Sequence, residues 1–551
     1  MRYVLSFLLA FASLAASAQA PLRDALLADK GPRLVVLIVI DQFRGDYLTR
    51  FSDLYLPARK GGTLGGFRFL MEEGAFFTNG RFDHIPLETG VGHSVIGTGA
   101  PPFYSGIAGN EWFDRTTRKA VYCTQDPLEP GEMSPRNLLS TTFADELKLA
   151  TGGKAKVVSI SIKDRAAILQ SGHLPDAVVW YDSRTGQART GKYYHGGRLP
   201  KWAQQANEQK LADNYKDKVW EAVVPQAHDR CIPVPAANVG APASFGTKFP
   251  HKLDGSDTGY YSTLRMTPWG TEWTLELAKR AAVTEQMGKD EVADALLVSI
   301  STNDYLGHAF GPDSPEVLEL SVATDRMLSQ FFNWLNTHVP GGIDRCLIAL
   351  TGDHGVAPIP EQALRSGIGA GRLDLGPVYK KIIAALDERF PGEGDWRLGE
   401  TAQWVHYDPE TARARKADPE AVERVIADVL SQEPGVFAAY TRTQYMEGRL
   451  PITELGKTLY RSFRPDRCGD VHIVLQPWWM LGGYSSGTTH GQPFVYDTHV
   501  PILFRGPGIQ PGLYVERVSP EDIAPTIATV LGTTFPSACT GRPIGLGTVR
   551  K

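Results

Sequence analysis

The sequence has little of several features that mark specialised classes of protein. Only 5 of its 551 residues are cysteines, and they do not have the spacing of a zinc finger. The formal net charge is −4, so no excess of positive charge draws the chain toward nucleic acid or an acidic membrane surface. Internal repeats and low-complexity tracts are absent, and outside the N-terminal residues no apolar run has the length of a membrane span. What remains is the composition of an ordinary globular protein.

The N-terminal residues have the pattern of a secretory signal peptide. Arg2 supplies a positive charge, the apolar run Val4–Leu14 follows, and small residues come next. We predict that residues 1–18 are cleaved off, because cleavage after Ala20 would place Pro21 directly beyond the bond. An uncleaved membrane anchor is the alternative, but the apolar run is too short to span a bilayer. A periplasmic or secreted protein without a stable membrane anchor is therefore expected.

An oxidising compartment would allow one or two disulfides, with one thiol left over. The five cysteines are Cys123, Cys231, Cys346, Cys468 and Cys539. Cys346 begins an apolar run and is expected to be a small buried hydrophobic side chain.

Continuous apolar runs alternate with helical patterns along much of the chain. Runs of Val, Leu and Ile without polar alternation are typical of strands buried on both faces, as in a parallel sheet. The four clearest runs are Leu34–Ile40, Val157–Ile162, Ala295–Ile300 and Cys346–Leu350. Strands that alternate with helices predict a doubly wound, mostly parallel α/β sheet flanked by helices. Ligands bind such sheets beyond the carboxyl ends of the strands.

The length allows about three domains, but one large α/β domain with insertions fits equally well. We predict a catalytic core from residues 21–165, 285–365 and 465–551. An inserted region at 166–284, rich in aromatic residues and glycine, is expected to form a cap. A small α+β insertion is expected at 366–464.

The segment Thr89-Gly-Val-Gly-His-Ser94 is predicted to open a helix. The ordinary interpretation of Thr89 is an N-cap. The same position also suits a nucleophile, because the free N–H groups of a helix N-terminus attract anions. A threonine hydroxyl needs its pKa lowered before it attacks, and coordination to zinc achieves this.

Acidic residues and histidines recur just beyond the predicted strands. Asp304 and His308 stand four residues apart, so on a helical turn both would face one metal ion. Adjacent Asp353 and His354 follow another strand at once. Each of these is unremarkable alone, since a single Asp or His is more often a turn or surface residue. Asp41 at a strand end and His490 in a small flexible loop complete an ordered set that can hold two neighbouring cations.

This ordered set resembles the alkaline phosphatase superfamily over roughly residues 30–165, 285–365 and 465–545. The resemblance implies two Zn²⁺ ions held by oxygen and imidazole ligands. One ion would be bound by Asp304, His308 and His490. The other would be bound by Asp41, Asp353, His354 and Thr89.

The sequence around Thr89 indicates which groups within the superfamily the chain resembles. No Cys-x-Pro-x-Arg motif of sulfatases occurs, and the segment Ser105–Trp112 resembles both nucleotide pyrophosphatases/phosphodiesterases and phosphate-irrepressible alkaline phosphatases. In both groups an asparagine at the position of Asn110 binds a phosphoryl oxygen. Lys163 and Arg165 are similar to the Lys-x-Arg segment of the alkaline phosphatases, and we expect them to alternate on an extended chain and face one side.

Added Lys and Arg donors favour a monoester, whose phosphate carries more charge than a diester. The resemblance therefore implies a two-zinc alkaline phosphatase that hydrolyses small phosphate monoesters through a phosphothreonine intermediate. Glu88 departs from the pattern, because a carboxylate beside the nucleophile would repel phosphate unless it points away. A phosphodiesterase with the same zinc core is the first alternative, and a non-catalytic secreted protein that binds zinc or phosphate is the second. Turnover of paired monoester and diester substrates separates the three.

Overall fold

The computed structural model describes residues 31–256, 258–482 and 486–546. The predicted signal peptide at residues 1–18 lies outside these ranges. Within them, no helix is both long and apolar enough to cross a membrane.

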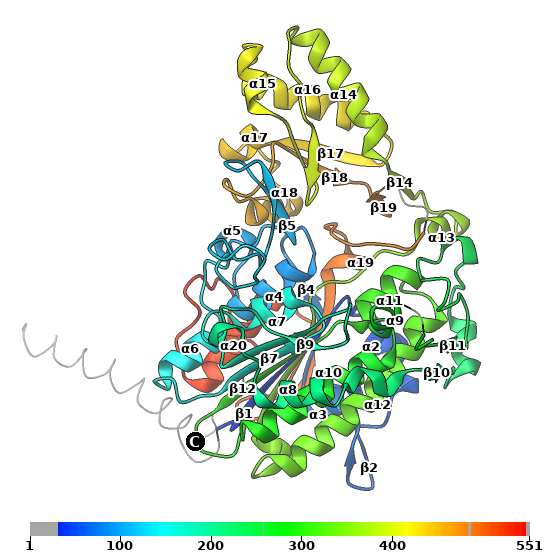
Figure 1. Ribbon diagram of the computed structural model, residues 1–551, viewed down its shortest axis with the longest axis vertical. Helices are drawn as coiled ribbons and strands as arrows, with labels where there is room; N and C mark the ends of the chain where they lie inside the picture. The colour runs from blue at the N-terminus through cyan, green and yellow to red at the C-terminus, as the bar shows by residue number, and fades with distance from the viewer. Residues whose placement is uncertain (1–30, 257, 483–485, 547–551) are drawn as a thin grey trace, which may run out of the picture.

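A nine-stranded mixed sheet forms the centre of the molecule (Figure 1). Its five middle strands are parallel, and antiparallel pairings occur toward both edges. This confirms the predicted doubly wound α/β fold. In spatial order the strands are β21 (Gly512–Tyr514), β4 (Ala75–Arg81), β20 (His499–Arg505), β13 (Cys346–Gly352), β1 (Leu34–Ile40), β12 (Asp294–Ile300), β7 (Val157–Ser161), β8 (Ala177–Tyr181) and β9 (Ala188–Arg189).

Strand β1 shows why the apolar runs are continuous. Its residues alternate between two hydrophobic clusters, with Val36 and Ile38 in one and Val35 and Leu37 in the other. All seven residues of the strand are buried, and each such side chain contributes on the order of 1.5–3 kcal/mol. The first cluster is covered by helices α3 (Phe67–Glu73), α10 (Pro268–Thr284) and α12 (Pro315–His338). The second is covered by α4 (Thr89–Thr98), α6 (Phe143–Ala150), α7 (Asp164–Ser171) and α20 (Ile523–Leu531).

The middle strands end level with one another. Ile40 at the end of β1 pairs with Ile300 in β12 and with Gly352 in β13. Because these strands are parallel, the residues that follow each of them emerge at the same edge of the sheet. This register decides which polar residues meet.

The region 166–284, predicted to be an insertion, includes strands β8 and β9 at one edge of the central sheet. Its remaining elements are short, and α10 covers the sheet (Figure 1). The short elements include α8 (Lys201–Glu208), α9 (Tyr260–Leu264) and the strand pair β10 (Val219–Trp220) with β11 (His251–Lys252).

A smaller α+β unit lies at the top of the molecule in Figure 1. It contains a four-stranded antiparallel sheet and its own hydrophobic core. The strands, in spatial order, are β15 (Gly399–Thr401), β16 (Trp404–His406), β18 (Val471–Leu475) and β17 (Val436–Thr441), with α14 (Leu375–Arg389), α15 (Pro409–Ala414) and α16 (Pro419–Ser431) packed on them.

The unit is entered and left through a parallel strand pair, β14 (Gly371–Leu373) with β19 (Trp479–Leu481). The expectation that the chain has returned to the core by residue 465 is therefore wrong for β18. This strand pairs with β16 and β17 of the small sheet, and its apolar residues pack into the small core. An apolar strand looks the same in either sheet, so the sequence pattern does not reveal the partner.

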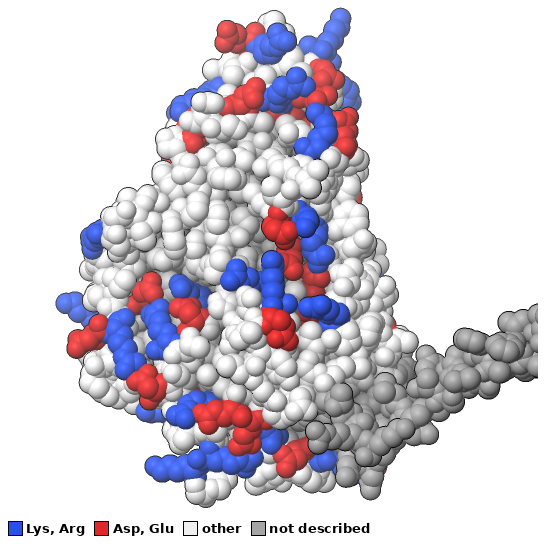
Figure 2. All heavy atoms as spheres, turned by 180° about the vertical axis from the view of Figure 1, so that it is seen from behind, with Lys and Arg blue, Asp and Glu red and all other residues white. Residues whose placement is uncertain are grey.

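Charged side chains are mixed on the surface. On the face shown in Figure 2, Lys and Arg side chains lie beside Asp and Glu in small groups, which agrees with the formal net charge of −4.

Candidate metal centre and active site

The level strand ends bring the predicted acidic ligands together. Asp41 follows β1 directly, and Asp353 follows β13 directly. Asp304 lies in the first turn of α11 (Thr302–Phe310), the helix that begins just after β12. All three carboxylates are buried, with at most 4% of each side chain exposed. Buried carboxylates this close together need cations to compensate their charge.

One ligand group contains Asp304, His308 and His490. The Nε2 atoms of His308 and His490 lie 3.2 and 3.6 Å from Asp304 Oδ1. His308 Nδ1 lies 2.7 Å from the carbonyl oxygen of Thr488, and His490 Nδ1 bonds to the carbonyl oxygen of Leu87. Nδ1 donates the proton in such bonds, so each Nε2 keeps its lone pair and can bind a metal ion.

The second group lies beside the first. His354 Nε2 is 3.4 Å from Asp41 Oδ1 and 3.6 Å from Asp353 Oδ2, while its Nδ1 is 2.9 Å from the carbonyl oxygen of Gly355. Ligand atoms of Asp41, Asp304 and His354 all lie within 4.8 Å of one another, so Asp304 stands between the two groups.

The polar atoms at this second group fit a cation. His354 Nε2 and Asp41 Oδ1 are buried without a hydrogen-bond partner among the described residues. Burial, together with the carboxylates of Asp304 and Asp353, raises the pKa of Asp41 well above its usual value. Carboxylate and imidazole donors of this kind suit zinc.

Thr89 is the first residue of α4, and its hydroxyl is not used for capping. Glu88 occupies the N-cap position, and it makes no side-chain capping bond. The ordinary interpretation of Thr89 as an N-cap is therefore wrong. Gly92 allows α4 to approach the metal centre closely, because a Cβ atom there would lie 2.2 Å from the carbonyl oxygen of Asp353.

Lys163 and Arg165 both reach the Thr89 hydroxyl. Lys163 Nζ lies 3.0 Å from Thr89 Oγ1, and Arg165 Nη2 lies 3.4 Å from the same atom. Lys163 also forms ion pairs with Asp41 and Asp304. Burial alone would lower the pKa of Lys163, but these two carboxylates outweigh burial and raise it.

The predicted reason for this convergence is wrong. Only Lys163 has extended backbone geometry, as the N-cap of α7, and Arg165 already lies in the first turn of that helix. The two side chains reach Thr89 from a helix N-terminus and not from alternating positions of a strand.

Asn110 and Glu88 are hydrogen-bonded to each other next to Thr89. Asn110 Oδ1 accepts a hydrogen bond of 2.8 Å from the Gly90 N–H, which leaves the Nδ2 amide group as the donor available to a ligand. Glu88 accepts a hydrogen bond from the Asn110 backbone N–H. Burial raises the pKa of Glu88 to about 7.

A cavity of about 220 Å³ opens between this centre and the small α+β unit. His490 and Glu88 connect it to the metal centre, while Glu400 comes from strand β15 and Gln403 from the turn between β15 and β16. The complete lining is Glu88, Ala357, Glu400, Ala402, Gln403, Trp479, Met480, Leu481, Thr489, His490, Gln492 and Asp497.

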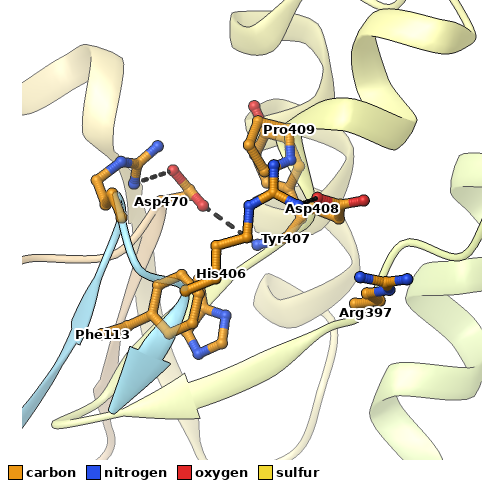
Figure 3. A pocket seen from close by; sticks show the side chains of 9 residues that line it. Phe113, Arg397, His406, Tyr407, Asp408, Pro409 and Asp470 are labelled. Atoms are coloured by element: carbon orange, nitrogen blue, oxygen red, sulfur yellow. Dashed lines mark hydrogen bonds and ion pairs between the residues drawn. The ribbon is translucent and has the colours of Figure 1, made fainter. Parts of the chain in front are cut away.

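A second cavity, of about 230 Å³, lies apart from these residues (Figure 3). The ring of His406 stacks on Phe113 with centroids 3.9 Å apart, and Arg115 pairs with Asp470 at 2.6 Å. None of the predicted ligands or substrate-binding residues lines it.

All five cysteines, which lie within the described ranges, are free thiols. The expectation of one or two disulfides is therefore wrong. Four of the five are buried, and a buried cysteine behaves as a small hydrophobic side chain.

The family model described as type I phosphodiesterase/nucleotide pyrophosphatase matches residues 35–499. The chain belongs to this family. The matched segment includes every predicted ligand, so the metal centre lies within the part that defines the phosphodiesterase family.

Similarity to curated relatives extends over almost the whole chain. An alkaline phosphatase, PhoV, of Synechococcus elongatus is 35% identical over 93% of this chain and 92% of its own length. The alkaline phosphatase PafA of Elizabethkingia meningoseptica is 34% identical over 93% of this chain and 94% of its own. A protein of Myroides odoratus named calcium-transporting ATPase is also 34% identical, over 93% and 94%. The expected resemblance to phosphate-irrepressible alkaline phosphatases is confirmed.

Solved structures agree. The crystal structure of PafA has a TM-score of 0.85 at 32% identity, covering 94% of this chain and all of that chain. Murine ectonucleotide pyrophosphatase/phosphodiesterase 5 has a TM-score of 0.50 at 14% identity, over 91% and 95% of the two chains, which supports the shared fold only.

Proposed function

We propose that this protein is a periplasmic or secreted alkaline phosphatase that hydrolyses small phosphate monoesters at a two-zinc centre. The observation that carries the proposal is the position of the Thr89 hydroxyl. It lies at the start of a helix, within 3.0 Å of Lys163 and beside two groups of metal ligands. The full-length likeness to PhoV and PafA, both named alkaline phosphatases, supports a monoester substrate over a diester.

The chemistry proceeds in two displacements. Thr89 Oγ1 attacks phosphorus, the P–O bond to the alcohol breaks, and its electron pair leaves with the alcohol oxygen. Water then attacks the phosphothreonine, which releases inorganic phosphate and restores the Thr89 hydroxyl. Zinc ions held by the two ligand groups would supply Lewis-acid activation of the Thr89 hydroxyl and of the leaving oxygen.

The other side chains position the phosphoryl group. Lys163 and Arg165 donate charge-assisted hydrogen bonds to its oxygens, and Asn110 donates from Nδ2. A solved variant of PafA carries substitutions at one Thr, one Asn, one Lys and one Arg, the same four residue types in the same chain order. The Glu88 carboxyl is held in place by the hydrogen bond that it accepts from the Asn110 backbone N–H.

The test compares an aryl phosphate monoester with the matching diester, before and after treatment with a chelator. We expect a higher kcat/KM for the monoester and loss of both activities on chelation. A preference for the diester would instead support the phosphodiesterase activity for which the family is named. No turnover of either substrate by zinc-loaded protein would leave only a binding function.

A further inference from the structure

The charged side chains that line the cavity beside the metal centre differ in sign from those that contact the Thr89 hydroxyl. Thr89 faces two cations, Lys163 and Arg165. Among the described residues that line the cavity there is no Lys or Arg, but there are three acidic residues, Glu88, Glu400 and Asp497. A substrate that spans both regions would therefore meet cationic side chains at its phosphate and a lining with acidic but no basic side chains at its alcohol portion.

The position of the cavity fits the alcohol portion of a substrate. His490 lines the cavity and also belongs to the ligand group with Asp304 and His308. The cavity extends from there to the turn between β15 and β16 in the small α+β unit. Its volume of about 220 Å³ is many times the space that one water molecule needs.

Several buried acceptor atoms of the lining have no partner. Gln403 Oε1, Gln492 Oε1 and Asp497 Oδ1 accept no hydrogen bond from any described residue. The three side chains are at least nine-tenths buried, with 7%, 6% and 0% exposed. The Gln403 amide is oriented by its Nε2, which donates to the carbonyl oxygen of Gly491 at 3.0 Å. An unpaired buried acceptor is destabilising, so a bound molecule with hydrogen-bond donors is favoured in this cavity.

Glu400 is the acidic residue that the small α+β unit contributes to the lining. It is half-buried, accepts a hydrogen bond from the Gln403 N–H, and lies near enough to Glu88 to raise the pKa of that carboxyl. Burial also raises the pKa of Glu400 itself. A cation beside it would stabilise the ionised form, because an opposite charge offsets the cost of burial.

We propose that this cavity binds the alcohol portion of the substrate and selects esters whose alcohol carries an ammonium group, such as aminoalkyl phosphates. Esters whose alcohol carries a further negative charge are disfavoured. The ammonium group donates hydrogen bonds to the unpartnered oxygens and lies close to Glu400, while Lys163 and Arg165 hold the phosphate. This inference rests on the proposed phosphatase function and adds the substrate class.

Three substrates with the same two-carbon alcohol skeleton test the proposal: 2-aminoethyl phosphate, ethyl phosphate and phosphoglycolate. Near pH 8 their alcohols carry a positive charge, no charge and a negative charge, because a primary amine remains protonated there. Comparing each variant with the wild type cancels the different intrinsic reactivities of the three esters. For Glu400→Gln, kcat/KM for 2-aminoethyl phosphate should fall about fivefold and that for phosphoglycolate should rise, since one partly screened charge is lost. Ethyl phosphate should change by less than about twofold, as an uncharged alcohol is insensitive to that charge.

Two further variants serve as controls. Glu400→Asp keeps the charge and should keep the wild-type order of preference even if it weakens turnover. Glu393→Gln removes an exposed carboxylate from the same α+β unit outside the cavity and should leave all three substrates unchanged. Thermal unfolding of each variant checks that it is folded.

Equal effects of Glu400→Gln on all three substrates would overturn the substrate-class inference. An unchanged preference between phosphoglycolate and 2-aminoethyl phosphate in Glu400→Gln would overturn it as well. In either case continued hydrolysis of ethyl phosphate would leave the proposed phosphatase function standing. Failure of the zinc-loaded wild type to hydrolyse any of the three would overturn both.

Discussion

At the scale of single residues, Thr89 combines features that a threonine rarely has together. Its hydroxyl does not cap the helix, and it lies beside two cationic side chains and the metal ligands. We predict that Thr89→Ala lowers kcat by at least about 10³-fold, whereas Thr89→Ser retains part of the activity, because only the hydroxyl is chemically required. Trapping the phosphoenzyme and mapping the phosphopeptide measures the same claim directly. A phosphoryl group found on another residue would refute it.

Lys163 and Arg165 should determine the preference for monoesters. Truncating both to alanine should raise the activation free energy of monoester hydrolysis by several kcal/mol. The barrier to diester hydrolysis should rise much less, since a diester carries less charge at those oxygens. The measurement is the ratio of the two kcat/KM values, which should fall by orders of magnitude. Equal losses for both substrates would show that the pair supports structure or general binding.

Of the two single variants, Arg165→Ala isolates the effect on phosphate binding better than Lys163→Ala does. Lys163 also pairs with Asp41 and Asp304, so its removal changes the charge at the ligands themselves. Arg165 contacts Thr89 and the Tyr122 hydroxyl instead. Measuring the zinc content of both single variants separates an effect on phosphate binding from an effect on metal binding.

At the scale of elements, the sequence predicts most of what the central sheet requires. A run of Val, Leu and Ile such as Leu34–Ile40 favours a strand buried on both faces, and a polar residue after such a strand emerges at the edge of the sheet. This is why Asp41, Asp304 and Asp353 could be named as neighbours without a structure. Their grouping depends on the register of the strands, which local patterns do not encode.

The lining of the cavity could not be predicted in the same way. Glu400 lies in the short strand β15 and Gln403 in the turn after it, neither belongs to a motif, and Gln492 lies in an irregular loop. Glu400, Gln403 and Gln492 meet Glu88 only because the fold packs together segments that are more than 300 residues apart in the chain. Likewise, the pairing of β18 with the small sheet depends on long-range contacts that its apolar sequence does not specify.

The stability of the fold should depend on pH through Asp497. This residue lies in the short helix α19 (Val495–Thr498), just after the loop that carries His490. This carboxylate is fully buried and accepts a hydrogen bond of 2.8 Å from the Gln492 N–H. Burial raises its pKa from 3.8 to about 8. Between these values the folded protein binds the proton more tightly than the unfolded chain does, so the free energy of unfolding falls as pH rises through this window.

Asp497→Asn should remove that slope while still offering an acceptor to Gln492. The variant and the wild type should be similarly stable near pH 4, and the variant more stable by on the order of a few kcal/mol near pH 9. Denaturant unfolding across this range is the measurement. Asp428→Asn, an exposed substitution on α16, serves as the control. Parallel curves for Asp497→Asn and wild type would show that Asp497 does not titrate in this window.

At the scale of the whole molecule, the fold is held together without covalent cross-links between cysteines. All five thiols are free in the structure, and burial raises the pKa of each. A thiol reagent should therefore count five thiols in denaturant and react slowly with the folded protein, because the thiolate is the reactive form. Reductant should leave the Tm unchanged. Fewer than five thiols in unreduced, denatured protein would mean that a disulfide forms.

Metal binding should stabilise the whole molecule as well as its activity. Without cations, the carboxylates of Asp41, Asp304 and Asp353 repel one another in a buried site, and Lys163 compensates only part of their charge. Chelation should therefore lower the Tm and abolish turnover, and Zn²⁺ should restore both. The two ligand groups can be tested separately, because His490 belongs to one and Asp353 lies at the other. His490→Ala and Asp353→Asn should each reduce the bound zinc measured by elemental analysis, while the exposed substitution Asp428→Asn should not. Full activity in protein shown to be metal-free would contradict the two-zinc mechanism.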